Sequence, residues 1–256
     1  MELFDSHVHL DDPAFDADRE LVVRRALDAG VTAMVTVGTT LSSSRAAAAL
    51  ADRYPEVYAA VAVHPQEATG ATEDALAELR GLADHPRVVA IGETGLDFAR
   101  PQPEPAVQER LFRWHIGLSI DTHLPLIIHC RDAYPAVLDI LEESSVATVI
   151  MHAFSGTAEY AQACAARGYA VSLAGPVTFR NARVPVDVAR VVPAASLLVE
   201  TDAPVLAPVP FRGRRNEPAY LRYTVARIAE VKGMPEAAVA QATVENARRI
   251  FRIGSV

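Results

Sequence analysis

The chain has 256 residues, half of them hydrophobic and 22% charged, which is typical of a globular protein with one large domain or two small ones. Its 24 lysines and arginines against 32 aspartates and glutamates give a net charge of −8, which argues against a protein that coats nucleic acid through a broad basic surface. Because no apolar run approaches the roughly 20 residues that span a bilayer, and the two cysteines suit a reducing compartment, we expect a cytoplasmic protein without a membrane partner.

Short, nearly continuous apolar segments alternate with amphipathic segments along the chain. The apolar segments predict eight strands, at Leu3–His7, Val31–Val37, Tyr58–Val63, Val88–Ile91, Leu126–His129, Thr148–His152, Ala170–Leu173 and Leu197–Glu200. The amphipathic segments predict helices at Asp16–Asp28, Ser43–Arg53, Glu73–Ala83, Ala106–Thr122, Tyr134–Glu143, Glu159–Arg167, Pro218–Val231 and Pro235–Phe251. Apolar strands without alternation are typical of parallel sheets that are covered on both faces.

The length and this alternation predict an α/β protein, a single-domain (β/α)8 TIM barrel over residues 1–256. The main alternative is an open doubly wound sheet, which would be favoured by a glycine-rich phosphate loop after the first strand, but the sequence has none there. In a barrel the C-terminal ends of all strands share one face, and active sites are built on that face. Residues that end or directly follow a strand are therefore the candidates for chemistry.

The first predicted strand ends at His7, and His9 follows two residues later in the same extended segment. Their side chains point to the same face because successive residues of a strand alternate between faces. Two neutral imidazoles at this spacing suit one transition-metal ion, which would lower the pKa of a bound water. A pair of surface histidines would give the same pattern, so the interpretation depends on the other strands.

Four more polar side chains lie at predicted strand ends: Glu93 after the fourth, His129 and His152 closing the fifth and sixth, and Asp202 after the eighth. Each one alone could be a hydrogen-bonding residue or a helix cap. Together with the first pair they make four imidazoles and two carboxylates, which are too many ligands for one tetrahedral ion with an open position. They predict two divalent ions, with zinc, manganese, iron or magnesium as candidates, although magnesium prefers oxygen ligands.

The segments around these residues resemble the signatures of the TatD family, metal-dependent hydrolases of the amidohydrolase superfamily. The segments are Asp5-Ser6-His7-Val8-His9, Gly92-Glu93-Thr94-Gly95-Leu96-Asp97, His129-Cys130-Arg131, His152-Ala153-Phe154-Ser155-Gly156, Glu200-Thr201-Asp202-Ala203-Pro204 and Asn216-Glu217-Pro218. The resemblance implies a TIM barrel, divalent metals and 3′-exonuclease action on DNA. It also implies how the ligands divide between the two ions: His7, His9 and Asp202 hold one, His129 and His152 hold the other, and Glu93 bridges them.

Three further residues are expected to support the reaction. Asp202 would accept the proton of the attacking water as a general base. The resemblance implies that His64, at the end of the third strand, contacts the scissile phosphate or assists proton transfer; the alternative is a structural hydrogen bond before a proline turn. Many relatives carry a second histidine two positions later, where this chain has Gln66. Glu200 is expected to accept a hydrogen bond from a metal-ligating histidine.

Arginines near the strand ends are candidates for contacts with a phosphate. Arg131, two residues after a predicted ligand, could hold a phosphate oxygen with its fork of donors or could instead orient one of the two carboxylates. Arg212, Arg214 and Arg215 form a basic run in the loop after the eighth strand. Such a run is either a solvated loop or, on the catalytic face of an acidic protein, a place for the phosphates of a nucleic acid.

Two other functions fit the same residues. The metal site could act on an ester or an aminoacyl-tRNA bond in place of a phosphodiester, because polarisation of a carbonyl uses the same ions. A metal-storing or metal-sensing protein is the third interpretation, and it would need a closed coordination shell. No heptad pattern or apolar face indicates an obligate partner, so the sequence is compatible with a monomer.

Overall fold

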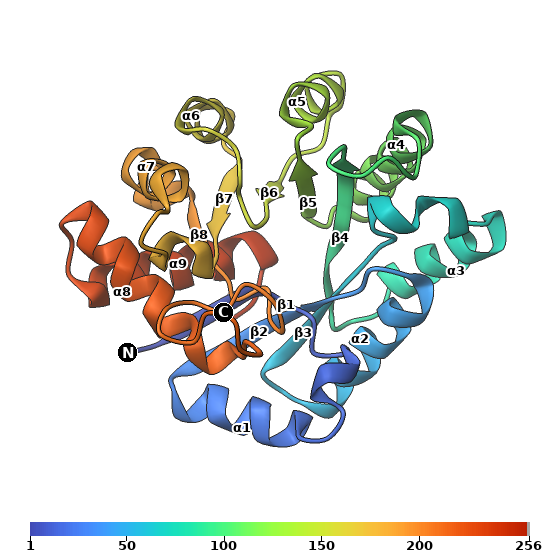
Figure 1. The fold of residues 1–256 in the computed structure, drawn as a ribbon. Helices are drawn as coiled ribbons and strands as arrows, with labels where there is room; N and C mark the ends of the chain where they lie inside the picture. Colours follow the sequence, from blue (N-terminus) through green and yellow to red (C-terminus); the bar gives the residue numbers. More distant parts are fainter. Residues whose placement is uncertain (255–256) are drawn as a thin grey trace. The chain divides into compact units, whose positions relative to one another are not determined.

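The computed structural model describes residues 1–254 (Figure 1). Its strands are β1 (Leu3–Val8), β2 (Val31–Val37), β3 (Val57–Val61), β4 (Val88–Asp97), β5 (Leu126–Arg131), β6 (Val149–Met151), β7 (Ala170–Leu173) and β8 (Leu197–Val199). Its α-helices are α1 (Arg19–Asp28), α2 (Leu41–Arg53), α3 (Glu73–Ala83), α4 (Pro105–Thr122), α5 (Tyr134–Glu142), α6 (Ala158–Ala166), α7 (Arg183–Val191), α8 (Leu221–Lys232) and α9 (Glu236–Phe251). The hydrogen-bonded order of the strands follows the sequence from β1 to β8, as the predicted (β/α)8 plan requires.

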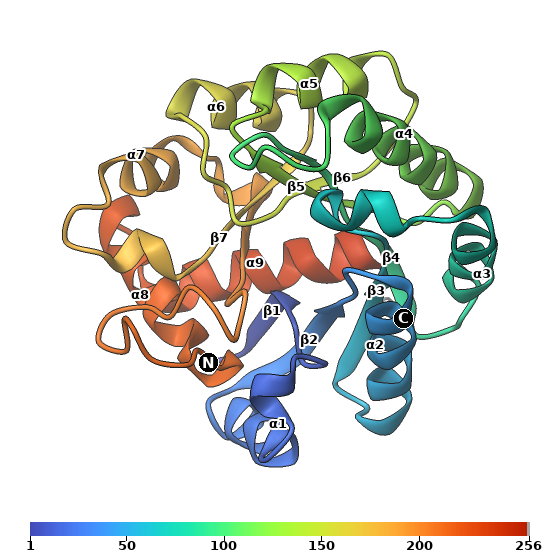
Figure 2. The same ribbon diagram turned by 45° about the vertical axis from the view of Figure 1, so that its right-hand side comes forward.

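The chain divides into two compact units, one made of residues 1–35 and the chain from Ala153 onward, the other of Thr36–His152. In the second unit β3, β4, β5 and β6 are parallel neighbours, and α4 and α5 lie outside β4 and β5 (Figure 1). In the first unit β7 and β8 are parallel, β8 lies beside β1, and α9 packs against β1 and β8. Figure 2 shows α9 beside β1. The prediction of one domain over the whole chain stays a prediction.

The strands form the apolar core, as the continuous hydrophobic segments predict. Leu126, Ile127 and Ile128 of β5 have no exposed surface, and every residue of β8 is buried. Strands with apolar side chains on both faces are stable only where other elements cover both faces. Within residues 1–254, none of the helices combines the length and the apolar character that crossing a bilayer requires.

Strand β4 runs on to Asp97, whereas the sequence pattern predicts its end at Ile91. The two glycines in the extension, Gly92 and Gly95, have φ angles of 151° and 130°, which other residues rarely adopt. A Cβ atom at Gly95 would lie 2.2 Å from the carbonyl oxygen of His129, so glycine is required for β4 to approach β5 this closely. The same glycines interrupt the apolar pattern, and this hides the extension from sequence analysis.

Helix α7 is a second difference, because the pattern predicts no helix between the seventh and eighth strands. Pro185 lies in the first turn of α7, where a proline is tolerated because the N–H groups of that turn have no partner within the helix. The proline interrupts the helical periodicity of the sequence. The helix predicted at Pro218–Val231 is also divided, into a 3-10 turn at Pro218–Tyr220 and α8.

Candidate metal centre

The first unit brings His7, His9 and Asp202 together at the ends of β1 and β8. The Nε2 atoms of the two histidines are 3.3 Å apart. Asp202 Oδ1 lies 3.7 Å from His7 Nε2 and 3.4 Å from His9 Nε2. His7 and Asp202 are buried and His9 is partly exposed. One cation could contact all three side chains, because one donor atom of each lies within 4.8 Å of the others.

Backbone hydrogen bonds hold this group in place. The N–H of Asp202 donates to the carbonyl oxygen of His7 at 2.9 Å, and the N–H of His9 donates to that of Ala203 at 2.8 Å. Asp202 has a φ of 54°, a conformation that aspartate adopts more readily than most residues. The amide of Asn216 donates to the carbonyl oxygen of the residue before Asp202 at 2.9 Å, which fixes the turn.

Two buried carboxyl groups brace the same strand ends. Asp5 Oδ1 and Oδ2 accept hydrogen bonds from the N–H and the hydroxyl of Thr201 at 2.9 and 2.5 Å. Burial raises the pKa of Asp5 to about 8, although the bonds from Thr201 oppose this shift. Glu200 Oε1 accepts a hydrogen bond from the backbone N–H of Ala153 at 2.6 Å. The bond predicted between Glu200 and a metal-ligating histidine stays a prediction.

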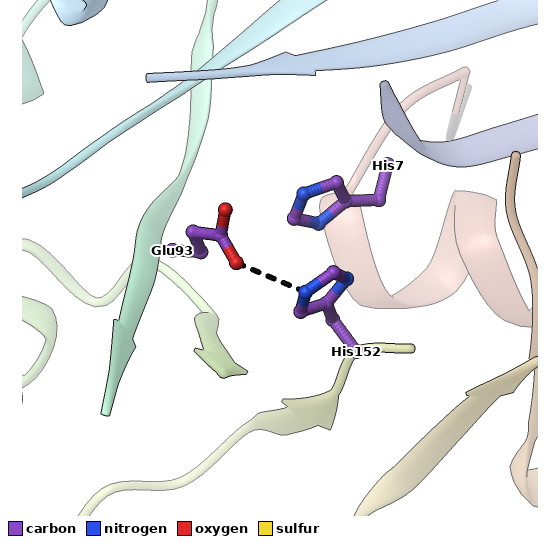
Figure 3. A group of neighbouring side chains, drawn as sticks. All are labelled: His7, Glu93 and His152. Atoms are coloured by element: carbon purple, nitrogen blue, oxygen red, sulfur yellow. Dashed lines mark ion pairs between the residues drawn. The ribbon is translucent and has the colours of Figure 1, made fainter. Parts of the chain in front are cut away.

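In the second unit, imidazoles surround the carboxylate of Glu93. His152 Nε2 lies 2.9 Å from Glu93 Oε2, and Figure 3 shows this ion pair as a dashed line. His129 Nδ1 and His64 Nε2 lie 3.4 and 4.0 Å from the same oxygen. The register between β4 and β5 shifts between Ile91 and Thr94. Glu93 therefore occupies a bulge, an irregularity that re-aims a side chain next to an active site.

The charges in this group are set by burial and by the neighbouring side chains. Burial alone would raise the pKa of Glu93, but the imidazoles, His152 first, outweigh it and hold the pKa well below its ordinary value. Burial lowers the pKa of His64 to about 4, so this imidazole is neutral at pH 7. Because the N–H of Gln66 donates to His64 Nδ1 at 3.1 Å, the proton of the neutral ring is on Nε2.

Asp97 lies in this group of side chains, although the sequence analysis does not single it out as a site residue. Its Oδ2 atom lies 3.2 Å from His129 Nε2, and Gln66 Nε2 donates to the same oxygen at 2.5 Å. Burial would raise the pKa of Asp97, but the contact with His129 and the bond from Gln66 lower it to about 2. An ionised Asp97 accepts a hydrogen bond from His129 Nε2–H, which leaves Nδ1 as the ligand atom on the side of Glu93. The signal was present, since Asp97 closes the segment that resembles the family signature.

We expect Asp97→Asn to weaken the binding of a divalent ion by about 10- to 100-fold, the usual cost of removing a carboxylate that orients a ligating histidine. Competition against a chromophoric chelator measures this affinity. Gln66→Ala is the matched control, because it keeps the bond between Asp97 and His129 and should change the affinity only a few-fold. Wild-type metal affinity in Asp97→Asn would show that His129 needs no such partner.

His115, a buried histidine to which the sequence assigned no chemistry, joins three elements next to this group. The N–H of Val63 donates to His115 Nε2 at 3.1 Å. The proton of the ring is therefore on Nδ1, which lies 2.9 Å from the carbonyl oxygen of Leu111 and 3.0 Å from Thr94 Oγ1. From helix α4, His115 thus holds Val63, the residue before His64, and Thr94, the residue after Glu93.

This histidine should make stability depend on pH. Burial lowers the pKa of His115 from 6.5 to about 4, so the unfolded chain takes up a proton first as the pH falls. The contribution of neutral His115 to the free energy of unfolding is fully present above pH 6.5. It falls by about 1.4 kcal/mol per pH unit as the pH is lowered from 6.5 toward 4. The free energy of unfolding of the metal-free wild type should therefore approach that of His115→Gln between pH 7 and pH 5 in urea titrations. A constant difference would contradict the buried, neutral imidazole.

Arg131 is exposed, and its backbone carbonyl accepts a hydrogen bond from the N–H of Phe98 at 2.9 Å. Within the part of the chain that the structure describes, its guanidinium forms no hydrogen bond or ion pair. The alternative that Arg131 orients a carboxylate therefore has no bond to support it in this structure. Its donors face solvent two residues from His129.

The three arginines of the loop after β8 differ in their contacts. Arg215 donates to both carboxylate oxygens of Asp18, at 2.7 and 2.8 Å, and so fastens the loop to the start of α1. Arg212 lies over the ring of Phe179, with its guanidinium carbon 4.3 Å from the ring centroid. Arg214 is exposed. Arg212 and Arg214 therefore stay candidates for substrate contacts, whereas Arg215 is occupied by Asp18.

The donor atoms fit divalent cations. At zinc–nitrogen distances of about 2.0–2.1 Å, the ligand atoms of a tetrahedral site lie about 3.3 Å apart. The separations among His7, His9 and Asp202 are 3.3 to 3.7 Å, and those from Glu93 to its two closest imidazoles are 2.9 and 3.4 Å. Imidazole nitrogens with carboxylate oxygens suit zinc, manganese or iron better than magnesium.

Comparison with known proteins identifies the family. The family model described as TatD related DNase matches residues 4–252. The Bacillus subtilis protein named uncharacterized metal-dependent hydrolase YabD is 43% identical over 253 residues, which cover 98% of this chain and 99% of that protein. The chain belongs to the TatD family. It is therefore a metal-dependent hydrolase, as the resemblance of its motifs predicts.

Two other TatD relatives add a more specific name and a solved structure. The Escherichia coli K12 protein named 3′-5′ ssDNA/RNA exonuclease TatD is 38% identical over 261 residues, which cover 98% of this chain and 99% of that protein. The crystal structure of YJJV, a TatD homolog from Escherichia coli K12, matches with a TM-score of 0.93 and 30% identity over 98% of both chains. These findings confirm the predicted (β/α)8 TIM-barrel fold.

Proposed function

We propose that this TatD protein hydrolyses the terminal phosphodiester of single-stranded nucleic acid, with DNA as the first substrate to test, from the 3′ end. The observation that carries the proposal is that imidazoles converge on the buried carboxylate of Glu93, at separations that a divalent cation would bridge. The substrate class is supported by the name of the Escherichia coli relative, 3′-5′ ssDNA/RNA exonuclease. A cytoplasmic location and a monomeric state stay predictions.

Two groups of ligands would each hold one ion: His7, His9 and Asp202 in the first unit, and Glu93, His129 and His152 in the second. A divalent cation, when bound, supplies charge that polarises the phosphodiester and lowers the pKa of water. We propose that both groups serve one reaction. The protein contributes the orientation of the ligands, as two hydrogen bonds illustrate: His129 Nε2–H donates to Asp97, and the backbone N–H of Asp202 donates to the carbonyl oxygen of His7.

The remaining steps belong to side chains of the protein. Asp202 accepts a proton as the oxygen of the attacking water bonds to phosphorus. The bond from phosphorus to the 3′ oxygen breaks, and that oxygen takes up a proton from solvent water to become a 3′ hydroxyl. His64, which is neutral, donates from Nε2–H to a phosphate oxygen. Arg131 holds a second oxygen with its fork of N–H donors.

A single preparation tests the substrate. The chain, loaded in turn with zinc, manganese and magnesium, is given a 5′-labelled single-stranded 20-mer, its duplex and an aminoacyl ester. We expect stepwise shortening of the single strand from the 3′ end and loss of this activity in excess chelator. If the ester is hydrolysed and the oligonucleotide stays intact with every metal, the substrate is an acyl ester and the proposed phosphodiester hydrolysis is wrong.

A further inference from the structure

A groove of about 380 Å³ on the first unit concentrates positive charge on this acidic chain. Its lining includes one acidic side chain, Asp187, and four arginines: Arg180, Arg183, Arg190 and Arg227. Arg190 pairs with Asp187 at 2.6 Å, and Arg227 pairs with a glutamate of α8 at 2.5 Å. The guanidinium groups of Arg180 and Arg183 form no hydrogen bond or ion pair with any residue from 1 to 254. Both side chains are exposed and free to bind an anion.

The groove begins beside the loop that carries Asp202. The N–H of Val209, in the loop after β8, donates to Thr178 Oγ1, in the loop after β7, at 2.8 Å. A Cβ atom at Gly175 would lie 2.0 Å from the carbonyl oxygen of Leu206, so the two loops are in backbone contact. Asp202 precedes Leu206 by four residues, a span of at most about 14 Å. In TIM barrels, the loops after the seventh and eighth strands frequently bind phosphate.

An aromatic side chain also lines the groove. Phe179 directly follows Thr178 and lines the groove together with Arg180. Arg212, from the loop after β8, covers one face of the Phe179 ring. The loop after β8 therefore places a further exposed arginine beside the groove. Guanidinium planes and aromatic rings together are typical of surfaces that hold a single strand.

We propose that this groove binds the phosphodiester backbone of the nucleic-acid strand whose 3′ end is hydrolysed at the metal centre, an inference that rests on the proposed function for the identity of the strand. Four arginines against one aspartate leave the lining with a charge of +3. Arg180 and Arg183 have no acidic partner to give up, and a guanidinium pairs with two phosphate oxygens at once. An acidic chain needs such a local patch to hold a polyanion.

Binding without hydrolysis tests the groove. A fluorescent single-stranded 12-mer is titrated with the chain in excess chelator, from 0.05 to 0.5 M salt. For a single strand each phosphate contact contributes about 0.7 to the slope of log K against log salt. Arg180→Ala/Arg183→Ala should lower the magnitude of the slope by about 1.4, which corresponds to about 25-fold weaker binding at 0.1 M salt. Arg24→Ala/Arg252→Ala, which removes two exposed arginines outside the groove, should keep the wild-type slope.

Kinetics separates the groove from the metal centre. In the metal-loaded chain the groove variant should raise KM for the 12-mer at least tenfold and change KM for a dinucleotide less than twofold, because the dinucleotide does not extend into the groove. If Arg180→Ala/Arg183→Ala keeps the wild-type slope and the wild-type KM, the groove does not bind the strand, and the proposed nuclease activity is unaffected by this result. If binding depends on Arg180 and Arg183 but no metal supports hydrolysis, the proposed nuclease function is wrong, whereas the proposal that the groove binds a single strand is supported.

Discussion

Glu93→Gln should lower the rate of phosphodiester hydrolysis by about 10³-fold or more and leave the chain folded, because the removed carboxylate accounts for several kcal/mol of transition-state stabilisation through a bound ion. An amide has the same shape as the carboxylate but carries no charge to hold a cation among His129 and His152. The measurement is kcat on the single-stranded 20-mer, with circular dichroism as the test of folding.

A matched variant separates this effect from a general change of charge. Glu73→Gln removes an exposed carboxylate at the start of α3 in the same unit and should keep wild-type activity and metal content. Glu93→Gln should also bind less metal than the wild type. A folded Glu93→Gln chain with more than a tenth of the wild-type kcat would remove Glu93 from the catalytic machinery.

Asp202→Asn should lower kcat by 10²- to 10⁴-fold, the range for loss of a general base, with a small change in KM. Asparagine is the informative replacement because it tolerates the φ of 54° that Asp202 adopts, so the turn after β8 should persist. Metal content distinguishes two explanations of the loss. A chain that keeps its ions has lost the proton acceptor, whereas one that has lost an ion has lost a ligand.

The double variant tests whether the two groups of ligands serve one reaction. Residues that act as a unit have strongly non-additive effects on the rate. Glu93→Gln/Asp202→Asn should therefore be little slower than the worse of the two single variants. If the two losses instead multiply, or if one variant alone keeps full activity, the groups act separately.

Much of the candidate site could be predicted because its residues lie at or just after the ends of the predicted strands. Parallel strands buried on both faces have continuous apolar sequences, so their ends are visible as the point where a polar side chain appears. His7 and Asp202 were found in this way, and the structure places both with His9 within reach of one cation. In the second unit Glu93 and His152 were found by the same signal and form an ion pair.

The parts that escaped prediction depend on contacts between segments distant in sequence. Asp97 was missed because Gly92 and Gly95 end the apolar pattern of β4 six residues before the strand itself ends. Arg215 looked equivalent to its neighbours, but an aspartate nearly 200 residues away occupies it. Helix α7 was hidden by Pro185, and the groove beside it combines arginines from α7, from α8 and from the loop after β7, which no local sequence pattern brings together.

The metal content of the purified chain, measured together with hydrolysis, tests whether these histidines and carboxylates act by holding metal. We predict two divalent ions per chain after reconstitution with zinc or manganese, complete loss of hydrolysis of the single-stranded 20-mer when a chelator removes them, and recovery when either metal is restored. Full hydrolysis by a chain that holds less than about a tenth of an ion would contradict the central claim that these histidines and carboxylates act by holding metal.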